Sequence, residues 1–303
     1  MYLQHFRLKE FPFGITPDTS FFFSSESSQQ ALNTLLIATR SGEGFIKITG
    51  EVGTGKTLLC RQLLLRVGPE FRTAYIPNPY LTPQGLLLDL AEELGILTGS
   101  RGLSGPPPDQ HLLLKVLNRH LLSIALQGQR VLVCLDEVQA MPIETLEALR
   151  LLTNLETEKR KLLQVVIFGQ PELDEKLNHP SIRQLKQRIT FDCHLAPLAG
   201  PELARYLAHR MAVAGHDGGR MFSASAVCLL RWRTRGLPRL VNIVAHKALL
   251  CAYGRGKQSV GVREMTEAVN DTALLRIRPP YVALASLALC ALGLLAVQLA
   301  RTA

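Results

Sequence analysis

The sequence lacks the features that mark a metalloprotein, a disulfide-stapled protein or an exported one. Its six cysteines are scattered and form no C-x-x-C pair, which argues against a disulfide framework or a zinc site. Its eight histidines show no H-E-x-x-H or other ligand spacing. No long apolar run follows the N-terminus, so we expect no secretory signal peptide. The 303 residues are 47% hydrophobic, enough for one large or two modest domains with a substantial core.

Basic and acidic residues are unevenly divided along the chain. Residues 1–149 contain 12 Lys or Arg and 14 Asp or Glu, a net charge of −2. Residues 150–303 contain 22 Lys or Arg and 11 Asp or Glu, a net charge of +11. This asymmetry indicates an acidic partner for the second half, either nucleic acid or an anionic membrane surface. A solvated basic face would give the same composition.

Short apolar strands alternate with longer helices in the first two thirds of the chain. The pattern predicts strands at 45–50, 73–77, 131–137, 162–169 and 190–195, and helices at 56–67, 83–96, 110–128 and 144–160. GSRGLSGPPPD at 99–109 predicts an exposed loop. After Leu198 only helices are expected. This order predicts an α/β domain with a parallel sheet covered on both faces, followed by a helical domain.

GEVGTGKT, at residues 50–57, fits the phosphate-binding pattern G-x-x-x-x-G-K-[ST]. A strand is expected before it and a helix after it. Glycines let backbone N–H groups curl around phosphates, and Lys56 would add a positive charge. A glycine-rich turn without a ligand is the alternative. The pattern predicts an ATP site at Gly50, Glu51, Val52, Gly53, Thr54, Gly55, Lys56, Thr57 and Leu58.

VLVCLDEVQ ends a buried strand on two carboxylates. In α/β sheets the carboxyl ends of the strands face the ligand crevice. Asp136 and the hydroxyl of Thr57 would therefore hold Mg²⁺, and Glu137 would activate the attacking water. A strand-to-helix cap is the structural alternative. ATP and Mg²⁺ are the cofactors that these motifs predict.

Three weaker features complete the predicted site. Gln170 ends another expected strand, where its amide would lie beside the γ-phosphate, although a simple turn is the alternative. Arg183 and Arg188 precede the last strand, and one of them is a candidate arginine finger for a neighbouring subunit, with ordinary solvated surface arginines as the alternative. Arg239 begins a helix in GLPRLVN and would fold back from the helical domain onto the nucleotide.

Residues 281–300 run without a charge and, at 1.5 Å per residue, make a helix of about 30 Å, the thickness of the hydrocarbon core of a bilayer. We therefore expect a transmembrane helix there, with a buried helix of the globular domain as the alternative. Arg276 and Arg278 on its N-terminal side favour a cytoplasmic location for the preceding domains. Residues 220–278, with 11 basic and 3 acidic residues, would lie against anionic headgroups.

The ordered set GEVGTGKT, LDEVQ, FGQPEL, QRI and GLPRLVN resembles the AAA+ ATPases of the ExeA type, a family that includes general secretion pathway protein A and the MSHA-pilus protein MshM. The N-terminal HFRLKEFPFGITPDTSFFF is similar too, so the resemblance spans about residues 1–275. Because only three residues follow the expected span, the layout is closer to MshM than to members with a peptidoglycan-binding extension.

The resemblance implies ATP hydrolysis by a ring-like homo-oligomer. It implies that Gln170 is sensor 1 and Arg239 sensor 2, with Arg188 preferred to Arg183 as the finger. It also implies work on a secretion or type IV pilus machine in the envelope, together with a membrane partner. We therefore expect a P-loop AAA+ domain at 1–197, a helical lid at 198–275, a basic linker at 276–280 and a transmembrane helix at 281–300.

The resulting hypothesis is a membrane-anchored AAA+ ATPase, passing once through the bacterial inner membrane with the ATPase domain in the cytoplasm. A DNA-associated AAA+ protein of the transposition-helper or initiator type is the rival, since its class shares the P-loop and the Gly-x-Pro-Arg helix. The expected span and the lack of a recognisable helix-turn-helix disfavour nucleic acid as a partner. A third hypothesis, a scaffold that binds ATP without hydrolysing it, is disfavoured by Glu137.

Overall fold

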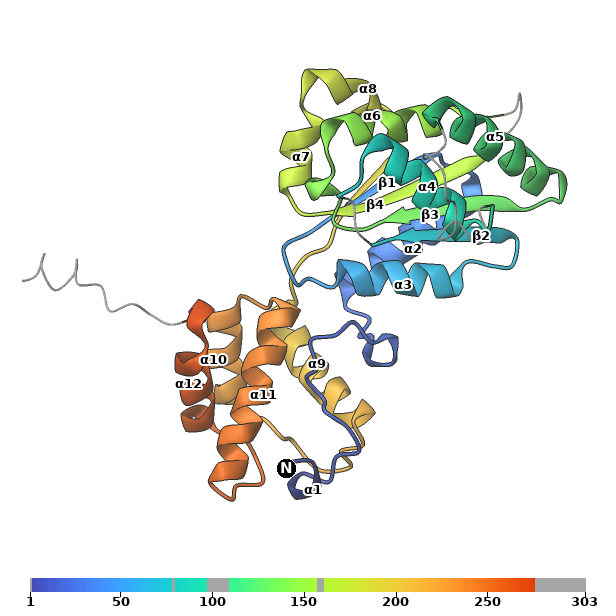
Figure 1. Cartoon of the computed structure of the whole chain (residues 1–303). Coiled ribbons are helices and arrows are strands. Elements are labelled where there is room, and N and C mark those ends of the chain that lie inside the picture. The colour runs from blue at the N-terminus through green and yellow to red at the C-terminus, as the bar shows by residue number, and fades with distance from the viewer. Residues whose placement is uncertain (1, 78–79, 97–108, 157–160, 276–303) are drawn as a thin grey trace, which may run out of the picture.

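A computed structural model of the chain describes residues 2–77, 80–96, 109–156 and 161–275. Figure 1 shows two bodies, one built on a sheet and one made of helices. Residues 99–108 of the expected loop lie outside the described residues, as do the expected linker at 276–280 and the expected span at 281–300.

The first body contains one parallel sheet of five strands in the order β2-β3-β4-β1-β5. The central strands β1 and β4 are buried along their whole length, as expected of apolar runs covered on both faces. The predicted α/β fold with a parallel sheet is therefore confirmed. Its strands are β1 (Phe45–Thr49), β2 (Phe71–Ile76), β3 (Arg130–Leu135), β4 (Leu163–Gly169) and β5 (Phe191–His194).

Helices cover both faces of this sheet, because successive side chains of a strand point to opposite faces. Along β3, Val131 and Val133 belong to one core cluster, while Leu132 and Cys134 belong to another. The second cluster packs under α2 (Glu26–Ser41) and α3 (Lys56–Arg66). The first packs under α4 (Pro83–Glu93), α5 (Gln110–Leu126), α6 (Ile143–Leu152), α7 (Glu172–Leu177) and α8 (Arg183–Lys186), with the short turns η3 (Val138–Ala140) and η4 (Pro180–Ile182) between them.

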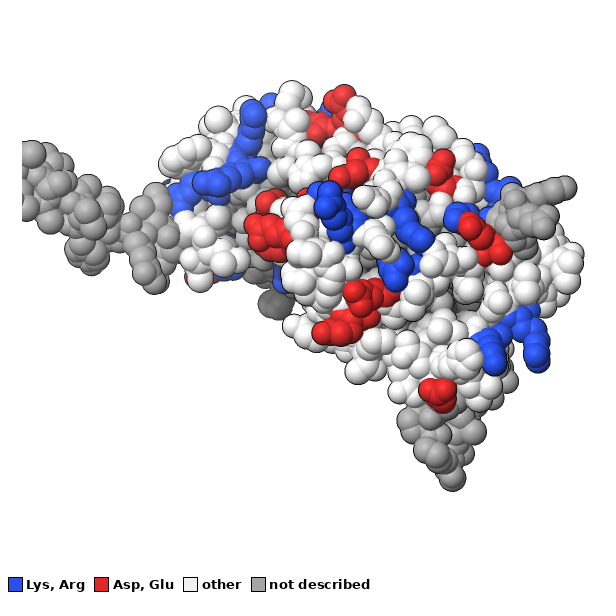
Figure 2. All heavy atoms as spheres, turned by 90° about the horizontal axis from the view of Figure 1, so that it is seen from above, with Lys and Arg blue, Asp and Glu red and all other residues white. Residues whose placement is uncertain are grey.

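Charges of both signs are interspersed over the sheet-containing body. Figure 2, which views the molecule from above, shows Lys and Arg alternating with Asp and Glu on that face, without an extended area of one sign. The described helical body is more basic. Residues 200–275 contain 11 Lys or Arg and five Asp or Glu, a net charge of +6.

The second body is a helical lid with its own hydrophobic core. It follows β5 directly and stands beside the carboxyl edge of the sheet (Figure 1). Its elements are α9 (Gly200–Val213), α10 (Ala224–Thr234), α11 (Pro238–Gly254), α12 (Val262–Asp271) and the turn η5 (Ala273–Leu275).

The N-terminal segment belongs to the core of the lid rather than to the sheet. It contains α1 (Tyr2–His5) and the turn η1 (Thr19–Phe21). The buried guanidinium of Arg210 on α9 donates hydrogen bonds to the Pro12 and Gly14 carbonyls. Our sequence analysis grouped residues 1–197 together, but the apolar side chains of this segment are buried among the lid helices: Tyr2, Phe6, Leu8, Phe13 and Phe21.

No helix among the described residues is long and apolar enough to cross a membrane. The longest, α5 and α11, have 17 residues each, or about 25 Å, which is less than the hydrocarbon thickness of about 30 Å. Helix α11 also carries Arg239 and Lys247. The expected location, a single pass through the bacterial inner membrane, is therefore not supported by any described helix and is corrected.

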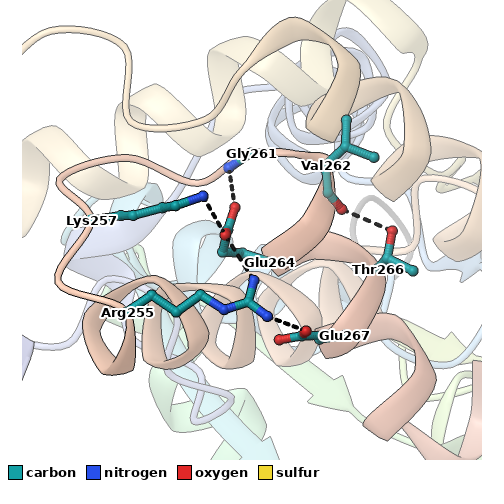
Figure 3. Close-up of polar contacts among 7 residues, drawn as sticks. All are labelled: Arg255, Lys257, Gly261, Val262, Glu264, Thr266 and Glu267. Atoms are coloured by element: carbon teal, nitrogen blue, oxygen red, sulfur yellow. Dashed lines mark hydrogen bonds and ion pairs between the residues drawn. The ribbon is translucent and has the colours of Figure 1, made fainter.

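A buried carboxylate closes the loop between α11 and α12. Glu264 is 0% exposed, accepts a hydrogen bond from the Gly261 amide at 3.0 Å and pairs with Lys257 and Arg255 (Figure 3). Arg255 also pairs with Glu267, whose side chain is 47% exposed. Lys257 chiefly, with Arg255, lowers the pKa of Glu264 to about 2 against the cost of burial. The ionised carboxylate therefore stabilises the folded lid.

Glu264→Gln should lower the stability of the lid at pH 7 by about 2–3 kcal/mol, because the lowered pKa reports favourable interactions of the charged form. A carboxyl whose folded pKa lies below its unfolded value contributes stability above the unfolded pKa, which is lost as pH falls through the folded one. The difference in free energy of unfolding between Glu264→Gln and wild type, measured by thermal unfolding, should therefore decrease as the pH falls from about 4.5 to about 2.

The matched control is Glu267→Gln, which removes a half-exposed partner of the same arginine and should change stability by less than about 1 kcal/mol. Equal losses for the two variants, or a Glu264→Gln difference that is independent of pH, would contradict this account.

Candidate active site

The carboxyl ends of β1, β3 and β4 bring the predicted residues to one edge of the sheet. The loop 50–55 follows β1 and leads into α3, whose first residue is Lys56. Asp136 and Glu137 follow β3, and Gln170 follows β4. Since parallel strands end at the same edge, residues far apart in the chain meet there.

Lys56 is buried inside the loop that precedes it. Its side chain is 4% exposed, and its ammonium donates hydrogen bonds to the carbonyls of Gly50 at 2.8 Å and Glu51 at 3.1 Å. Burial lowers the pKa of Lys56, while the carboxylates of Glu137 and Asp136 act in the opposite direction. The loop thus holds a positive charge at the N-terminus of α3, where backbone N–H groups and the helix dipole also favour an anion.

Asp136 and Thr57 place two oxygen donors side by side. The Thr57 hydroxyl donates to Oδ2 of Asp136, and the Glu137 amide donates to Oδ1 at 3.0 Å. Asp136 is only 3% exposed, and its burial raises its pKa despite these bonds. Tyr75, which sequence analysis did not single out, donates from its hydroxyl to Oδ2 at 3.5 Å. A hydroxyl and a carboxylate are ligands that Mg²⁺ prefers.

The protein alone does not enclose a metal at this edge. Among the described residues, no group of three or more His, Cys, Asp or Glu is arranged to hold a metal ion. Mg²⁺ usually takes one or two protein oxygens and completes its shell with water and substrate phosphates. The Thr57 and Asp136 pair therefore fits a magnesium ion that arrives with a nucleotide.

Two glutamine side chains hold Glu137. Its Oε2 accepts hydrogen bonds from Gln170 Nε2 at 2.9 Å and from Gln139 Nε2 at 2.6 Å. The other end of the Gln139 amide accepts from the Gln170 backbone at 3.0 Å. Burial raises the pKa of Glu137, but these bonds and the charge of Lys56 outweigh it, so the pKa is lowered overall. The carboxylate is ionised at neutral pH and fixed in direction.

The backbone of Glu137 is left-handed, with φ of 54°, a conformation that a residue with a side chain adopts at a cost. Our sequence analysis missed the partner Gln139. The available signal was the end of VLVCLDEVQ, where a glutamine follows Glu137 by two residues. That spacing alone does not predict a contact, because the amide of Gln139 reaches the carboxylate only through the turn η3.

Arg239, in the first turn of α11, brings the lid onto the phosphate loop. Its amide donates to the Gly53 carbonyl at 3.1 Å. Gly53 has φ of 82°, and a Cβ added there would lie 2.4 Å from the Cβ of Arg239. Gly53 is therefore required both by its own conformation and by the close approach of the lid. The contact places the exposed Arg239 side chain next to the loop.

The two candidate arginine fingers lie elsewhere. Arg188 is half-buried, and its guanidinium donates to the Arg150 carbonyl at 3.2 Å and the Thr153 hydroxyl at 2.7 Å. These bonds close the C-terminal end of α6, which stops at Leu152 rather than continuing to 160 as predicted. Arg183 is exposed at the start of α8. The hydrogen bonds of Arg188 thus go to α6 rather than to the phosphate loop.

Comparison with known proteins identifies the sheet-containing body. Residues 39–177 match the family described as "AAA domain". The chain is 39% identical over 277 residues to general secretion pathway protein A of Aeromonas hydrophila. The aligned region is 91% of this chain but 49% of that protein, so the chain spans about half the length of this curated relative. These findings confirm the resemblance to the ExeA-type AAA+ ATPases, and the AAA domain supports nucleotide binding and the predicted ATPase activity.

Solved structures of low sequence identity share the fold. Cdc6p from Pyrobaculum aerophilum has a TM-score of 0.63 at 20% identity, covering 84% of this chain and 70% of that one. The ORC2 protein of Aeropyrum pernix has a TM-score of 0.59 at 19% identity, covering 84% and 72%. The RuvB branch-migration motor of Thermotoga maritima has a TM-score of 0.53 at 15% identity, covering 86% and 73%. At these identities the likeness concerns fold alone.

Gly53→Ala should separate the lid from the loop, because the new methyl group collides with Arg239. The Arg239 amide then loses its acceptor, and hydrogen exchange in residues 237–242 should speed up by at least about tenfold. Gly42→Ala is the matched control. It has φ of 86° but open space around its added Cβ, so it should cost about 1 kcal/mol without changing exchange in the lid.

If exchange in residues 237–242 were equal in wild type and Gly53→Ala, the close contact between Gly53 and Arg239 would be refuted.

Proposed function

Because this chain carries an AAA domain and is an ExeA-type relative of general secretion pathway protein A, we propose that it hydrolyses Mg-ATP to drive assembly of a secretion or type IV pilus machine of the cell envelope. One observation carries the enzymatic part. Lys56, Thr57, Asp136, Glu137 and Gln170 converge at one edge of the sheet, and their hydrogen bonds link Thr57 to Asp136 and Glu137 to Gln170.

The phosphate loop supplies the nucleotide site in this proposal. Its N–H groups and the N-terminus of α3 receive the phosphate oxygens. Lys56 exchanges its two neutral carbonyl acceptors for charged phosphate oxygens, which makes stronger hydrogen bonds. The lid reaches the same place through Arg239, which acts as a second sensor of the phosphates. The residues assigned to the nucleotide are Gly50, Glu51, Val52, Gly53, Thr54, Gly55, Lys56, Thr57, Leu58 and Arg239.

Mg²⁺ fits the oxygen pair at the end of β3. Thr57 and Asp136 would hold the ion. Their present hydrogen bond, which keeps the two oxygens side by side, supports this assignment. When bound, the ion supplies charge neutralisation for the phosphates. Burial of Asp136 keeps competing water away from this carboxylate.

Glu137 is the proposed general base. Its lowered pKa keeps it ionised at neutral pH, and hydrogen bonds from Gln170 and Gln139 hold its carboxylate in place. In this proposal the carboxylate accepts a proton from the attacking water. Gln170 also senses the γ-phosphate in this proposal, since it leaves the adjacent strand β4. Because Gln170 donates a hydrogen bond to Glu137, a change in the contacts of Gln170 would alter the position of the Glu137 carboxylate.

The proposed active form is a ring-like homo-oligomer in which Arg188 completes the site of a neighbouring subunit. In the single chain Arg188 is held at the end of α6. Arg183, which is exposed and precedes Arg188 by five residues, is the alternative finger. The choice of Arg188 rests on the family resemblance.

The cellular role rests on the named relative. General secretion pathway protein A matches 91% of this chain, which includes the AAA domain and the lid. We propose that the partner of this ATPase is a component of the envelope machine. The pilus assignment follows the same resemblance and is the narrower version of this proposal.

Lys56→Ala should abolish binding of ATP, because it removes the charge-assisted phosphate contact. Glu137→Gln should bind ATP within about threefold of wild type but lower the turnover number by at least about a hundredfold, since only activation of water is lost. Isothermal titration with Mg-ATP and a phosphate-release assay measure the two effects, with circular dichroism as the control for folding. If Glu137→Gln hydrolysed ATP at the wild-type rate, the assignment of Glu137 as the general base would be wrong.

The same variant tests the cellular role. Cells that carry only Glu137→Gln should fail to assemble the secretion or pilus machine while accumulating the ATPase at the wild-type level. Normal secretion and normal pili in such cells would refute the proposed role and leave the enzymatic assignment intact.

A finger that acts between subunits should make activity depend on protein concentration. Lys56→Ala and Arg188→Ala should each be inactive alone. A mixture should recover turnover, because the Lys56→Ala subunit supplies Arg188 to the intact phosphate loop of its Arg188→Ala neighbour. A mixture of Lys56→Ala with Arg183→Ala is the matched control. If Arg183 is not the finger, Arg183→Ala is active alone, and the mixture should show no turnover beyond that of its Arg183→Ala subunits. Absence of rescue by Arg188→Ala would assign Arg188 to its structural role at the end of α6.

A further inference from the structure

Within the described residues the chain crosses twice between the lid and the sheet-containing body. The first crossing, residues 22–26, leaves the N-terminal segment and enters α2. The second, residues 195–200, leaves β5 and enters α9. Two neighbouring crossings restrict the lid far more than a single linker would, provided that they are fastened to each other. Their contacts show that they are.

Glu202, in the first turn of α9, joins both crossings with one carboxylate. Its Oε1 accepts from the Glu26 amide at 2.7 Å, and its Oε2 accepts from the Ala199 amide at 2.9 Å. Glu26 is the first residue of α2, and Ala199 immediately precedes α9. Glu202 is only 7% exposed. One buried negative charge therefore serves the N-termini of two helices, one in each body, where the helix dipoles favour it.

Further contacts hold the same junction. The Ala196 amide donates to the Ser27 hydroxyl at 2.9 Å, which ties the second crossing to α2 again. The Leu198 amide donates to the Gly236 carbonyl at 3.0 Å, which ties it to the turn before α11. A Cβ added at Gly200 would lie 2.1 Å from the Arg231 guanidinium, so α10 packs directly on the start of α9.

This junction is connected to the phosphate loop through a short path in the lid. Gly236 accepts the bond from Leu198 and precedes Arg239 by three residues, and Arg239 meets Gly53. A change in the angle between the two crossings would move the start of α11 and, with it, Arg239.

We propose that Glu202 is a positioning residue for nucleotide binding: its carboxylate fastens the two crossings into one hinge, and this hinge sets where Arg239 meets the phosphate loop. The inference rests on the proposed role of Arg239 at the nucleotide. An ordinary helix cap would explain the bond to Ala199, which lies three residues away. It does not explain the bond to Glu26, which lies 176 residues away on the other body.

The test is a double-mutant cycle between Glu202 and Arg239. Affinity for a fluorescent, non-hydrolysable ATP analogue with Mg²⁺ is measured for wild type, Glu202→Gln, Arg239→Ala and the double variant. We expect Glu202→Gln to weaken binding about tenfold, because the amide can accept only one of the two bonds and carries no charge. The double variant should bind as weakly as Arg239→Ala alone, since Glu202 acts through Arg239.

Glu267→Gln is the matched control, because it removes a lid carboxylate that touches neither crossing, and it should leave the affinity unchanged. Should Glu202→Gln fail to fold by circular dichroism, the cycle is run with Ser27→Ala, which removes the bond between the second crossing and α2. For that variant we expect affinity to fall about threefold, and we expect no such fall in the Arg239→Ala background.

The outcomes separate this inference from the proposed function. If the losses of affinity for the analogue add in the double variant, or if Glu202→Gln binds as tightly as wild type, the positioning role is overturned. If Arg239→Ala alone binds as tightly as wild type, the proposed role of Arg239 at the nucleotide is overturned, whatever the affinity of Glu202→Gln.

Discussion

Burial of two opposite charges, Lys56 and Asp136, at one edge of the sheet is the constraint on which the rest of the site depends. Neither side chain is more than 4% exposed, so each needs compensation from the protein. The loop carbonyls of Gly50 and Glu51 supply it for the lysine, and the Thr57 hydroxyl and Glu137 amide supply it for the aspartate. Each of these partners is fixed by β1, α3 or β3, so the loop geometry follows from the fold.

The same edge also organises the second body. The left-handed conformation of Gly53 exposes a carbonyl that receives the Arg239 amide, and the missing Cβ leaves room for that side chain. The N-terminal segment packs into the lid, so residues from the beginning of the chain and from the lid helices form one hydrophobic core. A nucleotide between the loop and Arg239 would therefore act on both crossings of the chain, which Glu202 joins.

The sequence predicts those parts of the molecule that are set by local patterns. The phosphate loop, the two carboxylates after β3 and the buried strands each depend on a few neighbouring residues, and the structure has these elements within a few residues of the expected bounds. The parallel sheet follows from strand and helix alternation. The AAA match at residues 39–177 agrees with this part of the prediction.

What the sequence does not predict depends on contacts between distant residues. Gln139 acquires a role only when η3 folds it onto Glu137. The end of α6 at Leu152 depends on Arg188, 36 residues further along the chain, and no local breaker marks it. The N-terminal segment precedes the sheet in the sequence and was therefore grouped with it, but its aromatic residues pack against the helices of the lid. The expected membrane location was inferred from one apolar run outside the described residues, and no described helix replaces it.

Hydrogen exchange of the full chain, with and without a non-hydrolysable ATP analogue and Mg²⁺, tests most directly whether the phosphate loop and the lid form one site. The account predicts that the analogue protects residues 50–58 and residues 237–242 together, because Gly53 and Arg239 are in contact and would share the nucleotide. Protection of the loop without any change at 237–242, or no protection of either segment, would contradict it.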